Sequence, residues 1–195
     1  LREKSKERKF PQTVDLIISL KEFDIKKPEN KFSEELLLPN GRGDEANVVV
    51  FSDSLKDLDS KVLNSSDIQN LAKNKREARK LVRDADFSLA EAPLMPVIGK
   101  SLGQLLAPRG KMPKIISGDV NSLVKNLKKS VRIRIKDSPV IQCLVGNEKM
   151  EDKKIVENIE VVLKFLESKL PKGRHNIKEV LVKMTMSKPV KVEPW

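Results

Sequence analysis

The hydrophobic pattern of this chain changes twice along its length, and this change limits the folds that the chain can adopt. Over residues 13–20 apolar and polar residues alternate, which is the period of a strand with one buried face. Residues 47–51 are instead a continuous apolar run, typical of a strand buried on both faces of a parallel sheet. Alternation returns at residues 131–135. We therefore expect one antiparallel unit made from both ends, and an inserted α/β unit between crossings near residues 41–45 and 128–130.

The two ends of the chain carry the elements expected of an antiparallel α+β unit. The pattern predicts strands at 13–20, 36–38 and 177–186, a hairpin of 131–135 with 140–145, and a helix at 151–170. A polar, helical-looking start precedes Lys9 and Phe10. The predicted first domain comprises residues 1–41 and 130–195.

The middle of the chain alternates strands with helices, which predicts right-handed βαβ units and a parallel sheet. The pattern predicts strands at 47–51, 61–63 and 87–90, and helices at 54–62, 67–83, 101–106 and 121–129. The predicted second domain comprises residues 45–127, so the fold class is α/β with two domains.

The composition of the 195 residues excludes several classes of protein. One cysteine, Cys143, and one histidine, His175, allow no intramolecular disulfide and no zinc cluster of Cys and His ligands. A single histidine also argues against Ser–His–Asp or Cys–His catalysis. No apolar run approaches the roughly 18 residues of a membrane span, so we expect no membrane partner. We expect neither a metal nor a cofactor. Because the first residue is Leu1 and not Met, we expect a few N-terminal residues to be missing or trimmed.

Two short motifs test the alternative of a nucleotide-using α/β enzyme. Gly99-Lys100-Ser101 is similar to the end of a phosphate-binding loop, but Leu94 stands where that motif needs its earlier glycine. Gly41 and Gly43 have the spacing of a dinucleotide fingerprint, but they precede their strand and do not follow it. Both motifs fail, so they argue against this alternative.

The charge of the chain points to a polyanionic partner. The formal net charge is +11, and acidic residues are absent between Glu91 and Asp119, between Asp119 and Asp137, and between Glu179 and Glu193. The alternative is an ordinary solvated surface of lysines. With six Phe, one Trp and no Tyr, the chain has few rings on which bases could stack. If the partner is nucleic acid, contacts to phosphate, sugar and overall shape should dominate.

One long run of residues resembles a known family. The run at residues 91–113 contains Gly99-Lys100-x-Leu102-Gly103 and then Pro108-Arg109-Gly110-Lys111-Met112-Pro113. It is similar to the hallmark stretch of the ribosomal protein L-one family, the stalk protein of the large ribosomal subunit, and is closest to its archaeal branch. Further matches are Lys9-Phe10-x-x-Thr13-Val14-Asp15, Leu38-Pro39-Asn40-Gly41 and Thr185-Met186, in the family's order.

The resemblance implies an architecture and a set of partners. It implies a discontinuous α+β domain of the RRM-like split β-α-β type that carries both termini, and an inserted Rossmann-like domain on two hinges. It implies a non-enzymatic, cytoplasmic protein of the ribosome that binds large-subunit rRNA, shapes the mobile stalk beside the exit-site tRNA and helps tRNA to leave. It leaves open repression of translation through the protein's own mRNA. The free protein is expected to be a monomer, and a ribosome-biogenesis relative of the same fold remains an alternative.

The resemblance also carries RNA-binding residues onto this chain. The main set is Lys9, Phe10, Thr13, Asp15, Thr185, Met186, Ser187 and Lys188, and the peripheral set is Lys183, Arg109, Lys111 and Lys114. The hydroxyls of Thr13 and Thr185 can both donate and accept, as contact with a 2′-OH requires. Asp15 could accept from a ribose hydroxyl or a base amino group.

Three points about these sets stay open in the sequence. Phe10 and Met186 could meet a sugar or base face, or could belong to the core. Ser187 stands where the family has Gly, so its Cβ puts close backbone approach to RNA in doubt, although its hydroxyl could donate to RNA. The glycines and prolines of the hallmark run are interpreted as shaping a turn in the second domain.

Overall fold

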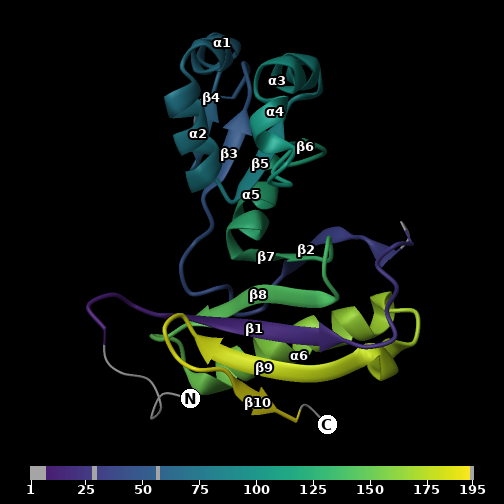
Figure 1. The fold of residues 1–195 in the computed structure, drawn as a ribbon. Helices are drawn as coiled ribbons and strands as arrows, with labels where there is room; N and C mark the ends of the chain where they lie inside the picture. The colour runs from purple at the N-terminus through teal and green to yellow at the C-terminus, as the bar shows by residue number, and fades with distance from the viewer. Residues whose placement is uncertain (1–7, 28–29, 56–57, 194–195) are drawn as a thin grey trace. The chain divides into compact units, whose positions relative to one another are not determined.

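The computed structural model describes residues 8–27, 30–55 and 58–193, and the chain forms two compact units (Figure 1). Unit 1 combines residues 1–45 with residues 129–195, and unit 2 comprises residues 46–128. Each unit is described by itself. Most of the helical-looking start predicted before Lys9 lies outside the described residues.

Unit 1 contains strands from both ends of the chain and one long helix. Its elements are β1 (Thr13–Leu20), β2 (Ser33–Leu37), β7 (Ser130–Arg134), β8 (Val140–Asn147), α6 (Asp152–Lys169), the 3-10 helix η4 (Gly173–Asn176), β9 (Ile177–Met184) and β10 (Val190–Val192). The predicted strands and the helix at 151–170 are found within a few residues of these bounds, and β10 was not predicted.

A four-stranded sheet in the order β10-β9-β1-β8 is the main layer of unit 1 (Figure 1). Both β8 and β9 run antiparallel to β1, which lies between them, so they are parallel to each other. Helix α6 connects β8 to β9, which makes a split β-α-β unit. The alternating residues Val14, Leu16 and Ile18 of β1 are buried in one cluster with Val162 and Leu166 of α6. The predicted amphipathic pattern is therefore confirmed on the face of β1 that packs against α6.

The predicted hairpin of residues 131–135 with 140–145 is wrong. Strand β7 pairs antiparallel with β2 in a separate two-stranded sheet, whereas β8 pairs with β1. Both strands exist, but alternation along a strand shows only which residues share a face. It does not identify the strand with which each one pairs.

Unit 2 is built on a parallel sheet. Its elements are β3 (Val48–Phe51), β4 (Lys61–Leu63), α1 (Ser65–Lys73), α2 (Lys75–Asp84), β5 (Phe87–Ala90), the 3-10 helix η3 (Ala92–Leu94), α3 (Met95–Ser101), α4 (Gly103–Leu106), β6 (Lys114–Ile115) and α5 (Val120–Lys129). The strands lie in the order β4-β3-β5-β6, and all neighbouring pairs are parallel. The predicted α/β class is therefore confirmed.

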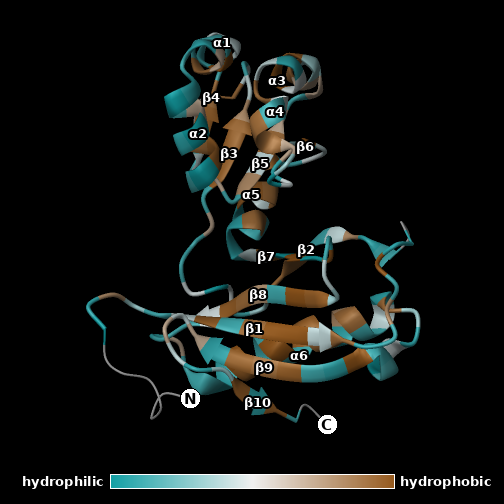
Figure 2. Cartoon of the chain, viewed as in Figure 1, coloured by the Kyte–Doolittle hydropathy of each residue, from teal (hydrophilic) through white to brown (hydrophobic). Residues whose placement is uncertain are grey.

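Two apolar layers bury the two faces of this parallel sheet. On one face, Val49 and Phe51 of β3 pack with residues of α1, α2, α3 and α4. On the other face, Val48 and Val50 pack with Val124 of α5. Every residue of β3 and β5 is buried, and Figure 2 shows both strands as hydrophobic. The predicted strand at residues 47–51 is thus confirmed for Val48–Phe51 as a strand buried on both faces, whereas Asn47 is exposed and precedes it.

The predicted helix at 54–62 is wrong over the residues that the structure describes there. Residues 54–55 and 58–60 are not helical, and β4 follows at once. The Ser52 hydroxyl oxygen accepts hydrogen bonds from the backbone N–H groups of Ser54 (3.2 Å) and Leu55 (2.9 Å). These local bonds satisfy the backbone donors in a turn, so they compete with a helix.

The single helix predicted at 67–83 is two helices, α1 and α2, that meet at Asn74. Asn74 has φ −103° and ψ 83°, outside the helical region, and its side chain accepts from the N–H of Glu77 at 3.4 Å. Asn74 therefore ends α1 and caps α2, as asparagine commonly does at helix N-termini. The predicted start at residue 67 is also displaced, because α1 starts at Ser65 after the N-cap Asn64.

The short helix predicted at 101–106 is longer and divided. Helix α3 starts at Met95 and α4 ends at Leu106. Pro93 and Pro96 stand in the first turns of η3 and α3, where a missing N–H is tolerated, so they do not stop a helix here. The sequence pattern also missed β6. No helix among the described residues is long and apolar enough to cross a bilayer.

Candidate nucleic-acid interface

The start of β1 and the end of β9 meet through two threonines, Thr13 and Thr185. The N–H of Thr13 donates to the hydroxyl of Thr185 at 3.0 Å, and the N–H of Thr185 donates to the carbonyl of Thr13 at 3.1 Å. The two hydroxyl oxygens lie 2.9 Å apart, and either can donate to the other. Both side chains are half-buried, so this pair, which lies 172 positions apart in sequence, keeps access to solvent.

Asp15 lies beside this pair and faces Lys183 across the two strands. Asp15 and Lys183 are register partners of β1 and β9, and the Thr13 hydroxyl donates to the Asp15 carboxylate at 3.4 Å. Burial raises the pKa of Asp15 above its usual 3.8, while Lys183 and the hydrogen bond from Thr13 oppose the rise. The carboxylate is therefore held where its negative charge is incompletely solvated.

Two large apolar side chains that lie close to the two threonines in sequence are exposed to solvent. Phe10 is 47% exposed and Met186 is 60% exposed. This decides the alternative left open by the sequence, because neither side chain belongs to the core. We call the set Phe10, Thr13, Asp15, Lys183, Thr185 and Met186 the threonine site. It offers hydroxyls, one carboxylate, one ammonium and apolar surface.

Gln12 and Glu148 support this site, and the sequence analysis missed both. Gln12 is fully buried, and its side-chain oxygen accepts from the N–H of Met186 at 3.2 Å. Its own N–H donates to the Glu148 carboxylate at 3.1 Å, and the N–H of Glu148 donates to the Gln12 carbonyl at 2.8 Å. The sequence does contain a signal for the burial of Gln12. Gln12 precedes the buried Val14 and Leu16 of β1 at intervals of two residues, which places its side chain on the same face of the strand.

The turn that follows β9 is closed by Ser187. Its hydroxyl oxygen accepts from the N–H of Met184 at 2.8 Å, and its N–H donates to the Met184 carbonyl at 3.0 Å. Glu22 is the only non-glycine with a positive φ among the described residues, so serine is unstrained at 187. A contact from this hydroxyl to RNA would compete with its role in the turn. Lys9 and Lys188 are both exposed.

The hallmark run of unit 2 has a clear structural role. Gly110 has a φ of +66°, its N–H donates to Ala107, and the N–H of Lys111 donates to Leu106, both at 3.0 Å. These are the hydrogen bonds of a Schellman motif, in which glycine at the left-handed position ends the helix. The prediction that this glycine shapes a turn is consistent with this geometry.

Lys111, predicted as a peripheral RNA contact, reaches back to helix α2. Its ammonium donates to the carbonyls of Val82 (3.0 Å), Arg83 (3.1 Å) and Ala85 (2.6 Å). A cation at these C-terminal carbonyls satisfies acceptors that the helix leaves unpaired. Contact between Lys111 and RNA stays a prediction, and it would compete with these three bonds.

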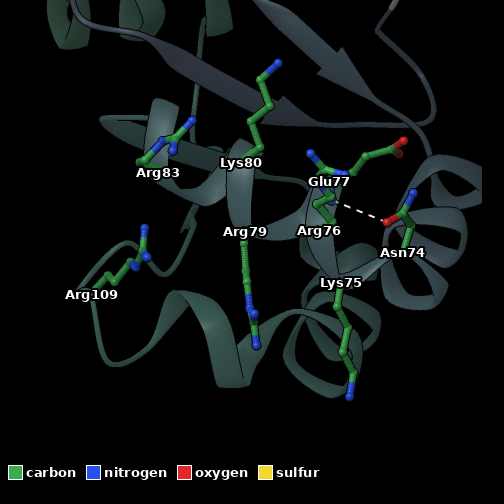
Figure 3. Close-up of a pocket in the computed structure, with 8 residues that line it drawn as sticks. All are labelled: Asn74, Lys75, Arg76, Glu77, Arg79, Lys80, Arg83 and Arg109. Atoms are coloured by element: carbon green, nitrogen blue, oxygen red, sulfur yellow. Dashed lines mark hydrogen bonds between the residues drawn. The ribbon is translucent and has the colours of Figure 1, made fainter.

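The other peripheral cations of unit 2 occupy separate places. Lys114 is exposed on β6, and Arg109 lines a hollow beside α2 (Figure 3). Arg109, Lys111 and Lys114 all belong to unit 2, whereas the threonine site belongs to unit 1.

The described residues contain no group of three or more His, Cys, Asp or Glu that could hold a metal ion. Burial raises the pKa of the Cys143 thiol to about 12, so this cysteine stays protonated in the core at neutral pH.

Comparison with known proteins identifies relatives over nearly the whole chain. The model of the ribosomal protein L1p/L10e family matches residues 1–188. Three relatives carry the name large ribosomal subunit protein uL1. The relative from Methanocaldococcus jannaschii is 45% identical over 98% of this chain and 91% of its own length. Those from Pyrococcus horikoshii and Thermococcus kodakarensis are each 43% identical over 97% of this chain, and over 90% and 92% of their own lengths.

Proposed function

Because the chain belongs to the ribosomal protein L1p/L10e family, we propose that it binds large-subunit rRNA through the threonine site of unit 1. The family and its archaeal branch confirm the resemblance seen in the sequence, and they make this chain a protein of the large ribosomal subunit and not an enzyme. Specific recognition of rRNA by the threonine site is our proposal and goes beyond this family assignment.

The observation that supports this proposal is the pair of hydroxyls 2.9 Å apart, together with the exposed apolar side chains of Phe10 and Met186, which lie close to the two threonines in sequence. Each hydroxyl can donate and accept, so the pair can satisfy a ribose 2′-OH, the group that separates RNA from DNA. Phe10 and Met186 present apolar surface to a sugar or base face. Lys9 and Lys188 attract the phosphates of the RNA. Asp15 accepts a hydrogen bond from a ribose hydroxyl or a base amino group, and so favours RNA that presents a donor at this position.

Further parts of the proposal follow from the resemblance. In the ribosome, the protein shapes the mobile stalk near the exit-site tRNA, with units 1 and 2 as domains joined by hinges near residues 41–45 and 128–130. It works in the cytoplasm, and it is a monomer when free. Repression of translation by binding its own mRNA at the same site is a second function, and it requires an rRNA-like fold in that mRNA.

The test is to replace Thr185 and measure binding to a large-subunit rRNA fragment. We expect Thr185→Val to weaken binding by about 1–3 kcal/mol, because an RNA hydroxyl loses its partner in a desolvated contact. Thr185→Ser keeps the hydroxyl and should bind nearly as the parent does. The affinity is measured over a salt series, and the parent should bind a random RNA duplex much more weakly.

The matched control is Lys114→Ala on β6, which we expect to change the affinity for the rRNA fragment little. If Lys114→Ala costs more than Thr185→Val, the specific site lies on unit 2 and the proposal is wrong. Equal affinity of the parent for the fragment and for random duplex would likewise contradict a specific site.

A further inference from the structure

Helix α2 carries a dense group of cations beside a hollow of about 930 Å³. The hollow is lined by Lys75, Arg76, Arg79, Lys80 and Arg83 of α2, by Arg109 from the loop after α4, and by Asn74 and Glu77 (Figure 3). We call the six cations the α2 basic surface. Figure 2 shows α2 as strongly hydrophilic, in contrast to the strands of the same unit.

The helix spacing explains why these side chains are all exposed. Ala78 and Val82 are buried against the sheet, whereas all five cations of α2 are exposed. Arg76, Arg79 and Arg83 stand at spacings of three and four, so they share one side of the helix. From Lys75 to Arg83 the helix rises about 12 Å, which is enough to face several phosphates of one nucleic-acid backbone.

Most of these charges are not neutralised within the protein. In the described part of the chain, Lys75, Arg76, Arg79 and Lys80 make no ion pair, and Arg83 pairs with its neighbour Asp84 at 3.1 Å. Glu77 is the only acid in the lining of the hollow. The four positive charges that make no ion pair repel one another, and a bound polyanion would reduce this electrostatic repulsion.

Hydrogen bonds from other parts of unit 2 fix the positions of the residues in the α2 basic surface. The turn closed by Gly110 places Arg109 at the hollow. Lys111, the next residue, ties this turn to α2 through its three carbonyl contacts at the C-terminal end of the helix. The positions of α2 and Arg109 are therefore coupled by hydrogen bonds.

We propose that the α2 basic surface binds the phosphate backbone of double-helical RNA without reading its sequence. Four of the six cations are arginines, whose planar guanidinium groups bind phosphate with two hydrogen bonds. No aromatic residue lines the hollow, so the surface lacks the stacking platforms of single-strand binders. It has no large apolar side chain to insert into a bilayer either. This inference goes beyond the rRNA site and does not depend on it, because the residues lie in the other unit.

The test uses the full chain and a 20-base-pair RNA duplex of arbitrary sequence as the probe. The triple variant Arg76→Gln, Arg79→Gln and Lys80→Gln removes three unpaired charges and keeps good helix formers. We expect its affinity for the duplex to fall at least about tenfold near 0.1 M salt, and its salt slope to become shallower by about 2–3. Thermal unfolding should show that the variant is folded.

The matched control removes three exposed lysines of the same unit that do not line the hollow, Lys61, Lys100 and Lys125, each replaced by Gln. It should keep duplex binding within about threefold, since it has the same net charge as the triple variant. An equal loss in both variants, or no loss in the triple variant, overturns the proposal. So does a parent protein that binds an acidic peptide as tightly as the duplex. Thr185→Val should leave the affinity for the duplex unchanged. The proposals for the threonine site and for the α2 basic surface can therefore be contradicted independently.

Discussion

At the scale of single residues, Asp15 shows that a half-buried acid can lower the stability of the fold. Its carboxylate is half-buried on β1, and burial raises its pKa despite Lys183 and Thr13. A raised pKa means that the folded protein holds the acid proton more tightly than the unfolded chain does. Ionised Asp15 therefore destabilises the fold at neutral pH.

Replacing Asp15 with Asn should consequently stabilise the free protein at neutral pH. The gain should be fully present above the raised pKa of Asp15, and should disappear as the pH falls below 3.8, where Asp15 is protonated in both the folded and the unfolded state. Unfolding by denaturant at several pH values measures this dependence. A variant that loses stability at pH 7, or gains it equally at every pH, would contradict this account.

At the scale of elements, the C-terminal end of α2 is hydrogen-bonded by Lys111, a residue 26 to 29 positions away in sequence. The family resemblance places Lys111 among cations that could touch RNA, whereas the structure shows its ammonium bonded to three carbonyls of the segment that ends α2. Its hallmark neighbour Gly110 supplies the positive φ that turns the chain toward this helix. These two residues of the hallmark run are thus explained by the packing of unit 2 without any ligand.

We expect Lys111→Met to lower the free energy of unfolding by about 1–3 kcal/mol, because the methionine stem still packs but three carbonyls lose their donor. The comparison variant is Lys125→Met, at an exposed lysine of α5, which should change stability by less than about 0.5 kcal/mol. Thermal or urea unfolding distinguishes the two. Equal stability of both variants would show that the three hydrogen bonds contribute nothing.

At the scale of the whole molecule, the two units have separate hydrophobic clusters. One cluster lies in unit 1, and the two clusters of unit 2 lie on opposite faces of its sheet. The crossing at residues 41–45 is fastened to unit 1 by the buried Asn158, whose amide donates to the carbonyls of Gly41 and Val145, both at 2.8 Å. Gly43 has a φ of +92° and leaves no room for a Cβ beside Asn147.

Gly43→Ala should therefore destabilise unit 1, by about 1–3 kcal/mol from backbone strain and more from the clash with Asn147. Gly118→Ala is the matched control, because Gly118 also has a positive φ, +87°, but open space around it. Hydrogen exchange should show faster opening of β8 in Gly43→Ala, with the amides of β3 and β5 still protected. Loss of protection in both units would show that they unfold together.

The sequence by itself determined the α/β class, the alternating strand β1, the buried strand β3 and the amphipathic helix α6. Each of these follows from a local period, because burial of one or both faces imposes a repeat on neighbouring residues. The residues that meet RNA in the proposal were named from the family resemblance.

Only the tertiary structure decided the features made by residues far apart in the chain. Pairing of β7 with β2, burial of Gln12 beneath Met186, and the bonds from Lys111 to α2 each join segments that no local period relates. The same holds for the hollow that unites Arg109 with the cations of α2. A polar or charged side chain has the same appearance in sequence whether it faces water or an unpaired carbonyl. Its partner, and therefore its role, is set by the packing of distant elements.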